Sequence, residues 1–183
     1  MEKHVDVIVV GGGHAGIEAS SAVARYGCKV VLITLKKNQI GEMSCNPAIG
    51  GLGKGHLVRE IDALDGIMGR AIDQSGIQFR MLNKSKGPAV HGPRSQADRD
   101  LYKKSVQKIL TLQQQVKVVE GFVDDLIINN QEIKGVVLDN NKELFCNCLI
   151  ITTGTFLGGK IFVGNKTFEA GRIGDKSSSK LSK

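Results

Sequence analysis

The sequence contains no tryptophan, only three prolines and few aromatic residues, which make up 4% of its 183 positions. It also lacks any apolar run of the ~18 residues that a membrane-spanning helix needs. An apolar segment follows directly after Met1-Glu2-Lys3-His4, which leaves no room for a signal or transit peptide. We therefore expect no membrane segment and a cytoplasmic location.

The cysteines, four in number, are predicted to remain reduced, because no export signal accompanies them. Cys146 and Cys148 are separated by one residue, which is not the spacing of a redox or zinc pair, and we expect both to pack in a sheet. His56 and His91 lack metal-ligand spacing, so no metal site is predicted. The net charge of +7 is compatible with a nucleic-acid partner and equally with a basic soluble surface.

The hydrophobic pattern predicts an α/β fold that begins with a βαβ unit. Residues 5–10 form a nearly continuous apolar run, typical of a strand buried on both faces of a parallel sheet. Helical spacing over 14–26 ends at Gly27, and a second apolar strand is expected over 29–34. The short strands that follow residue 115 are interpreted as a β-meander. Beyond the βαβ unit, the pattern predicts helices over 56–72 and 98–115, loops over 38–55 and 83–98, and strands over 77–82, 116–119, 122–128, 133–138, 143–145 and 149–152.

Glycine occupies the first, third and sixth positions of a dinucleotide-binding fingerprint, at Gly11, Gly13 and Gly16. The fingerprint lies between a predicted strand and a predicted helix, which is the context that supports this interpretation. Gly11 permits a tight turn, Gly13 lets the backbone approach a pyrophosphate, and Gly16 allows the helix to pack closely on the strand. Backbone N–H groups and the helix dipole then face the phosphates. We predict that the whole segment binds the cofactor, including Gly12, His14 and Ala15.

One element of the fingerprint departs from the usual pattern. An acidic residue normally ends the second strand and binds the ribose, but here Thr34 is followed by Leu35 and then by Lys36 and Lys37. The lysines are compatible with a 2′-phosphate, so the fingerprint alone leaves FAD and NAD(P) open. The later strand over 149–152, closed by a Thr-Gly pair, resembles the second cofactor strand of glutathione-reductase-like domains and favours FAD.

Several longer segments of the sequence are distinctive. The most distinctive is MSCNPAIGGLGKGHLV at 43–58, and the others are 61–66, 71–74, 83–90, 96–99, 154–157 and 171–175. Together and in this order, these segments resemble the GidA/MnmG family of tRNA-modifying flavoenzymes. The resemblance implies a FAD-binding, Rossmann-like (glutathione-reductase-like) parallel sheet with a β-meander. It also implies that 1–183 is the amino-terminal portion of this FAD-binding domain, incomplete by itself, with loop insertions at 38–55 and 83–98. We expect the family's NADH-binding and carboxy-terminal helical regions to lie outside this chain.

The resemblance also implies a function. Family members bind FAD and NADH, form homodimers and act with the GTPase MnmE. They add a carboxymethylaminomethyl or aminomethyl group to C5 of the tRNA wobble uridine (U34), with methylene-tetrahydrofolate as one-carbon donor and reduced flavin supplying reducing equivalents. Matching positions imply that residues 11–16, Val123 and Ser178 contact FAD and that Cys45 acts near the flavin. A Cys45 thiolate that adds to C6 of the uracil ring makes C5 nucleophilic.

Three alternatives remain open from the sequence alone. A flavin disulfide reductase carries a second cysteine in the same loop, and that residue is absent after Cys45. A folate- and FAD-dependent tRNA uridine methyltransferase shares the expected fold, although residues 44–55 fit the GidA/MnmG pattern better. The third alternative is a truncated FAD-binding fragment with no activity of its own. The densest basic stretch is either a grip on tRNA phosphates or a solvated loop, and consists of Lys84, Lys86, His91, Arg94 and Arg99.

Overall fold

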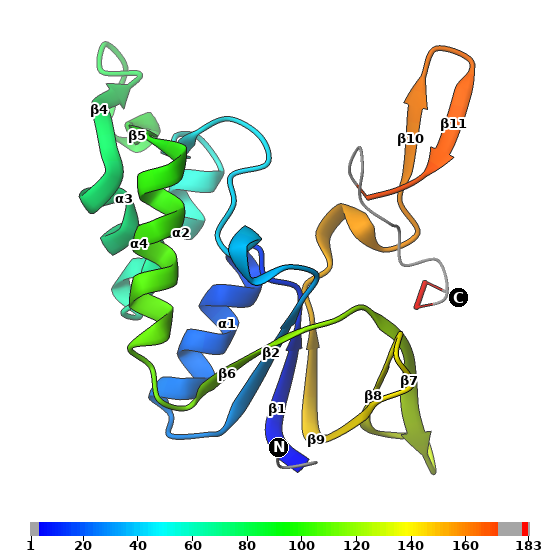
Figure 1. Ribbon diagram of the computed structural model, residues 1–183. Helices are drawn as coiled ribbons and strands as arrows, with labels where there is room; N and C mark the ends of the chain where they lie inside the picture. The colour runs from blue at the N-terminus through cyan, green and yellow to red at the C-terminus, as the bar shows by residue number, and fades with distance from the viewer. Residues whose placement is uncertain (1–3, 172–180, 183) are drawn as a thin grey trace. The chain divides into compact units, whose positions relative to one another are not determined.

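The computed structural model describes residues 4–171 and 181–182, so the predicted FAD contact Ser178 lies outside the described residues. The chain divides into two compact units, one within Met1–Asn38 and Gln115–Lys183 and the other Gln39–Gln114. Each unit has its own β-sheet, with six strands in the first and three in the second (Figure 1). No helix among the described residues is both long and apolar enough to cross a membrane.

The first unit is built on a mainly parallel sheet, as predicted. The sheet contains β1 (His4–Val10), β2 (Val30–Thr34), β6 (Val116–Glu120), β7 (Val123–Asn129), β8 (Glu132–Leu138) and β9 (Glu143–Ile151). β1 lies between β2 and β9, and β6 extends the sheet beyond β2, with all three pairings parallel. β9 continues into β8 and β7 through antiparallel pairings. A separate hairpin follows η3 (Gly154–Phe156) and consists of β10 (Lys160–Val163) and β11 (Lys166–Glu169).

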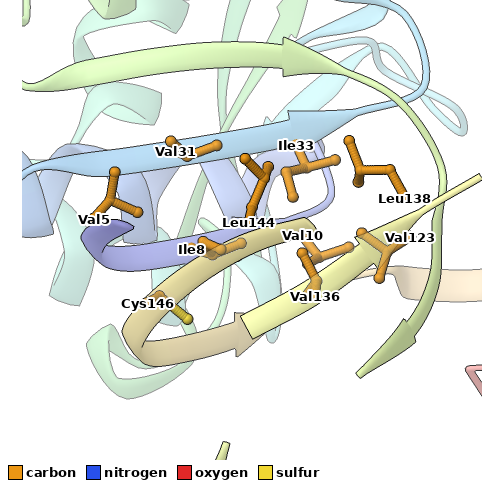
Figure 2. Packing of buried hydrophobic residues seen from close by; sticks show 10 residues of the cluster. All are labelled: Val5, Ile8, Val10, Val31, Ile33, Val123, Val136, Leu138, Leu144 and Cys146. Atoms are coloured by element: carbon orange, nitrogen blue, oxygen red, sulfur yellow. The ribbon is translucent and has the colours of Figure 1, made fainter. Parts of the chain in front are cut away.

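Buried apolar side chains hold the first unit together. α1 (His14–Arg25) packs on β1 and β2, and its Ile17 is completely buried. Side chains from β1 and β2 also pack against the antiparallel strands in a single cluster (Figure 2), which consists of Val5, Ile8, Val10, Val31, Ile33, Val123, Val136, Leu138, Leu144 and Cys146. Because burying one Val, Leu or Ile side chain contributes about 1.5–3 kcal/mol, this cluster fixes the meander to the parallel strands.

Two details of the first sheet differ from the predicted elements. The pattern predicts separate strands over 143–145 and 149–152, but β9 runs without a break through both. The exposed Asn147 and Cys148 interrupt the apolar pattern without interrupting the extended backbone, whereas Cys146 is buried as expected. β6 is not part of the meander, because it pairs in parallel with β2 at the edge of the sheet.

The second unit combines a small antiparallel sheet with three helices. It contains β3 (Ala48–Gly50), α2 (Lys54–Ala63), α3 (Ile67–Ser75), β4 (Gly76–Leu82), η2 (Pro88–Val90), β5 (Gly92–Ala97) and α4 (Arg99–Thr111), and the 3-10 turn η1 (Lys37–Gln39) precedes it. β5 is the central strand, between β3 and β4. α3 and α4 pack against each other, and Ile67, Tyr102 and Val106 are completely buried.

The single helix predicted over 56–72 is wrong, because the chain turns between α2 and α3. Asp65 has a φ of 62°, and Gly66 is the N-cap of α3. Arg70 stabilises this turn, since its Nε donates to the Gly66 carbonyl at 3.2 Å and its Nη2 to the Asp65 carbonyl at 3.4 Å. The apolar stripe predicted for one long helix is broken accordingly, and Leu64 is 74% exposed.

The loop predicted over 83–98 is wrong for Gly92–Ala97, which forms the central strand β5. The sequence pattern did not predict this strand because it contains Pro93, and proline is rare within central strands. The structure tolerates it because the pairing of β5 with β3 ends where Arg94 faces Gly50. No β3 residue is therefore paired with Pro93. The loop predicted over 38–55 is likewise interrupted by the short strand β3.

Candidate functional site

The glycine-rich turn joins β1 to α1 at the carboxyl edge of the parallel sheet. Gly11 donates its backbone N–H to the Ile33 carbonyl at 2.8 Å, and its φ of 113° is one that favours glycine. A β-carbon on Gly11 would collide with the backbone of Thr152. Glycine is therefore required at this position by the crowding of the backbone itself.

Gly16 and Gly13 lie in different surroundings. A β-carbon on Gly16 would collide with the Gly11 carbonyl oxygen and lie 2.8 Å from Thr152 Oγ1, so only glycine lets the helix pack against the turn. At Gly13, no described atom lies within 4 Å of the equivalent position. Gly13 is the exposed N-cap of α1, whose first turn carries no acidic residue. This open helix start fits a pyrophosphate, which approaches the backbone where a side chain is missing.

The other predicted residues of the turn lie beside this opening. Gly12 is partly exposed between the two outer glycines. His14 and Ala15 begin α1, where Ala15 is exposed and His14 is partly buried. All six residues of the predicted segment therefore fall in one turn and the start of one helix.

Thr152 connects this turn to β9, although the sequence pattern does not single it out. Its backbone N–H and its Oγ1 both donate to the Val10 carbonyl, each at 2.8 Å. The same Oγ1 lies 3.2 Å from the Gly11 carbonyl oxygen. The signal in the sequence is the Thr-Thr-Gly that follows the last strand of the sheet. Its meaning depends on β9 lying next to β1, which only the three-dimensional pairing reveals.

The carboxyl end of β2 brings a second backbone segment to this edge. Gly121 donates its N–H to the Thr34 carbonyl at 3.0 Å. Val123 follows at the start of β7; it is 4% exposed and packs in the cluster that contains Leu138 (Figure 2). The Val123 side chain is thus enclosed in the core and is not presented to a ligand.

A carboxylate is present beside the end of β2, but β6 supplies it. Glu120 is the register partner of Thr34, and its Oε1 accepts a hydrogen bond from the Lys37 backbone N–H at 2.7 Å. Glu120 is exposed, and a carboxylate there can also accept a hydrogen bond from a ribose hydroxyl. The sequence does not reveal this residue, because it lies 83 positions from Lys37 and reaches β2 only through the parallel pairing.

In the second unit, Cys45 lies in a loop that Arg99 holds in place. Arg99 Nη1 donates to the Met43 carbonyl at 2.8 Å, and Nη2 donates to the Cys45 carbonyl at 2.7 Å. Because Arg99 is the first residue of α4, these two bonds fix the loop to the start of that helix. The Cys45 side chain is exposed. The arrangement presents an accessible thiol on a backbone that is held by charge-assisted hydrogen bonds.

Lys54 lies within electrostatic range of Cys45. Its Nζ donates to the Ala48 carbonyl at 3.0 Å. Burial lowers the pKa of Lys54, the neighbouring Cys45 thiolate raises it, and the Arg94 charge lowers it further. Lys54 therefore places a cation within electrostatic range of the Cys45 side chain. His56, two residues after Lys54, is exposed and forms no hydrogen bond with Cys45 in the part of the chain that the structure describes.

The basic stretch predicted as one surface is divided by the fold. Lys84 and Lys86 are exposed on the connection between β4 and β5, where His91 Nε2 lies 3.0 Å from the Lys86 carbonyl oxygen. Arg94 lies on β5, and Arg99 is bound to loop carbonyls. Arg99 therefore serves the structure of the Cys45 loop rather than an external phosphate.

Comparison with known proteins identifies the family. A family model described as Glucose inhibited division protein A matches residues 6–183. The chain belongs to the GidA family. It is 59% identical over 181 residues to the tRNA uridine 5-carboxymethylaminomethyl modification enzyme MnmG of Granulibacter bethesdensis. The matched region covers 97% of this chain and 29% of that protein.

Solved structures agree with this membership. A crystal structure of Aquifex aeolicus GidA matches with a TM-score of 0.93 and 48% identity, over 98% of this chain and 30% of that one. The GidA-related protein of Thermus thermophilus shares the fold, with a TM-score of 0.65 and 17% identity over 97% of this chain and 65% of that chain. The present GidA-family chain thus spans less than a third of the length of its close relatives.

Proposed function

We propose that this GidA-family chain is the FAD-binding part of an enzyme that modifies C5 of the wobble uridine of tRNA. The observation that carries the proposal is the turn at residues 11–16, where the backbone is crowded at Gly11 and Gly16 but open at Gly13. That contrast is expected of a turn that holds a pyrophosphate, and the similarity to MnmG supplies the reaction.

The FAD site is proposed from contacts at the carboxyl edge of the first sheet. Residues 11–16 hold the pyrophosphate, and the backbone at Val123 meets the adenine. Glu120 is placed to accept a hydrogen bond from the ribose, and Ser178 is a further contact by family resemblance. The bound flavin, once reduced, would supply the reducing equivalents for the reaction.

Cys45 is the proposed nucleophile toward the uridine. Its Sγ adds to C6 of the uracil ring, and the electron pair of the C5–C6 bond shifts to C5 and the O4 carbonyl. C5 then attacks an electrophilic one-carbon unit, after which loss of the C5 proton and departure of the thiolate restore the ring. Lys54 lies within electrostatic range of the thiol, and Arg99 holds the loop carbonyls on either side of Ser44.

The remaining partners are proposed from family membership. NADH reduces the flavin, and methylene-tetrahydrofolate donates the one-carbon unit. The GTPase MnmE acts together with a homodimer of the whole protein in the cytoplasm. In this proposal residues 1–183 form the amino-terminal portion of a single FAD-binding domain.

The cofactor part of the proposal is tested by the absorbance spectrum of the purified chain, followed by denaturation and chromatography of the released compound. We expect a flavin spectrum and released FAD. A demonstrably folded chain that takes up no FAD, even when FAD is added, would contradict the assignment of residues 11–16.

The nucleophile is tested by trapping. An anticodon stem-loop RNA with 5-fluorouridine at the wobble position is incubated with the FAD-loaded full-length protein that contains this chain, NADH, methylene-tetrahydrofolate and MnmE. Once C6 carries the thiol and C5 carries the one-carbon unit and fluorine, no C5 proton remains to be lost, so the thioether persists on a denaturing gel. The adduct should disappear in Cys45→Ser and remain in Cys148→Ser, the matched control, because Cys148 is also an exposed free cysteine.

A further inference from the structure

The small sheet of the second unit places two arginines directly opposite each other. Arg80 on β4 and Arg94 on β5 are register partners in an antiparallel pair. Directly opposed residues lie on the same face, with β-carbons about 4.5–5.5 Å apart, and like charges in this position destabilise a sheet. The pairing therefore carries an electrostatic cost that calls for an explanation.

No carboxylate of the described chain offsets this cost. Neither Arg80 nor Arg94 has an ion-pair or hydrogen-bond partner among the described residues. A third cation adds to the repulsion, because the Arg94 charge helps to lower the pKa of Lys54. The Lys54 ammonium is held nearby through the Ala48 carbonyl of β3, the strand that pairs with β5. Arg80 and Arg94 thus gather with Lys54 at one small sheet, and the two arginines have no ion-pair partner among the described residues.

Two glycines lie beside these groups. Gly50 on β3 is the register partner of Arg94, so the row across the sheet reads Gly50, Arg94 and Arg80. Arg94 Cδ lies 3.9 Å from where a β-carbon of Gly51 would be, which places the arginine stem alongside this glycine. The next row on the same face carries the amides of Gln78 and Gln96. The face therefore carries cations and hydrogen-bond donors, and Gly50 adds no side chain to their row.

We propose that this face, defined by Arg80, Arg94 and Lys54, binds a phosphodiester group of the RNA substrate. A guanidinium presents a planar fork of N–H donors that matches phosphate oxygens. An open strand face suits a phosphate within a continuous chain. The identity of the ligand as RNA rests on the proposed function, whereas the presence of an anion site rests on the uncompensated cations. The site differs from the basic stretch read from the sequence, because Arg80 belongs to it and Arg99 does not.

The test measures binding of a fluorescent anticodon stem-loop RNA to the FAD-loaded chain at several salt concentrations. The double variant Arg80→Gln/Arg94→Gln should weaken binding roughly tenfold at moderate salt. It should also reduce the slope of log affinity against log salt by about 0.7 for each phosphate that the variant no longer binds. The charge-matched control is Lys103→Gln/Lys134→Gln, whose lysines have carboxylate partners, Asp100 and Glu132. This control should bind RNA as the unmodified chain does.

Three results would overturn the proposal. One is an unchanged affinity and salt slope in the arginine variant. Another is an equal loss in the lysine control, which would mean that only total charge matters. The third is displacement of the RNA by inorganic phosphate at fixed ionic strength and low concentration, which would identify a free-phosphate site instead. Arg80→Lys/Arg94→Lys, which keeps the charge and the fold, should retain the salt slope but lose part of the affinity. FAD content of every variant separates a failure of this proposal from a failure of the proposed function.

Discussion

Gly16 and Gly13 should respond differently to the same added methyl group: the first substitution should affect stability, and the second FAD binding. In Gly16→Ala the new β-carbon would collide with the Gly11 carbonyl oxygen and crowd Thr152 Oγ1. Overpacking of this kind costs about 1–3 kcal/mol. Displacing the Thr152 hydroxyl also weakens its two contacts, to the Val10 and Gly11 carbonyls, at about 1 kcal/mol each.

The net change in unfolding free energy for Gly16→Ala is destabilising, even though alanine is favoured over glycine within a helix. Alanine gains about 1 kcal/mol over glycine within a helix. The net loss in unfolding free energy is then about 2–4 kcal/mol. In Gly13→Ala no described atom lies within 4 Å of the new carbon, and φ of −76° suits alanine. Loss of the preferred N-cap glycine should cost under ~1 kcal/mol.

FAD affinity should reveal the effect of Gly13→Ala more clearly than stability does. The methyl group of Gly13→Ala enters the space that the pyrophosphate is proposed to use, so FAD affinity should fall roughly tenfold or more while the fold persists. Urea denaturation followed by circular dichroism gives the stability without FAD, and quenching of flavin fluorescence gives the affinity. Gly13→Ala that binds FAD normally would refute the assignment of the turn, and Gly16→Ala with unchanged stability would refute the steric argument.

Three further predictions concern the core, the Cys45 loop and a buried thiol. Leu138→Ala, at a side chain only 1% exposed, should lower the unfolding free energy by about 2–5 kcal/mol, whereas Leu112→Ala, 74% exposed, should change it by less than ~0.5 kcal/mol in urea denaturation. Arg99→Ala should cost about 1–3 kcal/mol and accelerate proteolysis within 43–47, detected by mass spectrometry. Burial raises the pKa of Cys146 above its ordinary 9.0, so the folded chain keeps a proton that the unfolded chain loses. Stability should therefore fall as pH rises past that value, and Cys146→Ala should remove this part of the pH slope.

Matched controls make these outcomes decisive. Arg70 also donates to two loop carbonyls, but in the turn between α2 and α3, so Arg70→Ala should leave cleavage near Cys45 unchanged. Equal acceleration in both arginine variants would mean that Arg99 does not hold the loop specifically. An alkaline pH slope that persists in Cys146→Ala would assign the titration to another group. Equal costs for the two leucines would contradict the packing of the first core.

The sequence was sufficient where structure depends on neighbouring residues. The first strand, helix and second strand agree with their predicted ranges to within one residue at each end, because local patterning determines them. Prediction failed where a distant partner decides the outcome. β5 contains a proline and becomes a strand only because β3 and β4 flank it. The break between α2 and α3 depends on Asp65 adopting a positive φ, which Arg70 stabilises.

The candidate site shows the same division. Residues 11–16 are recognisable because the fingerprint is contiguous, and their confinement to one turn follows directly. Thr152 and Glu120 reach the same edge through the pairing of β9 with β1 and of β6 with β2. No spacing rule in the sequence specifies those pairings. Family resemblance located Cys45, but the clamp by Arg99 required the fold.

Lys54 provides a way to examine the proposed phosphate-binding face through pH. Burial is the main cause that holds the pKa of Lys54 below its ordinary 10.5; Cys45 acts against it, and the Arg94 charge adds to the lowering. A phosphate bound beside Lys54 adds negative charge and moves that pKa upward. Binding must then take up a proton wherever the pH lies between the two pKa values, and by linkage the RNA affinity falls as pH rises through that window.

The experiment uses the Cys45→Ser background, because the Cys45 thiol also acts on the Lys54 pKa. RNA affinity is measured across the alkaline range in that background and in the same background with Lys54→Arg. Arginine keeps the positive charge and does not titrate, so its affinity should stay level while that of the Lys54 protein declines. An equal decline in both would assign the titration elsewhere. A level profile in both would place the bound phosphate out of range of Lys54, and the phosphate-binding face would then consist of the two arginines alone.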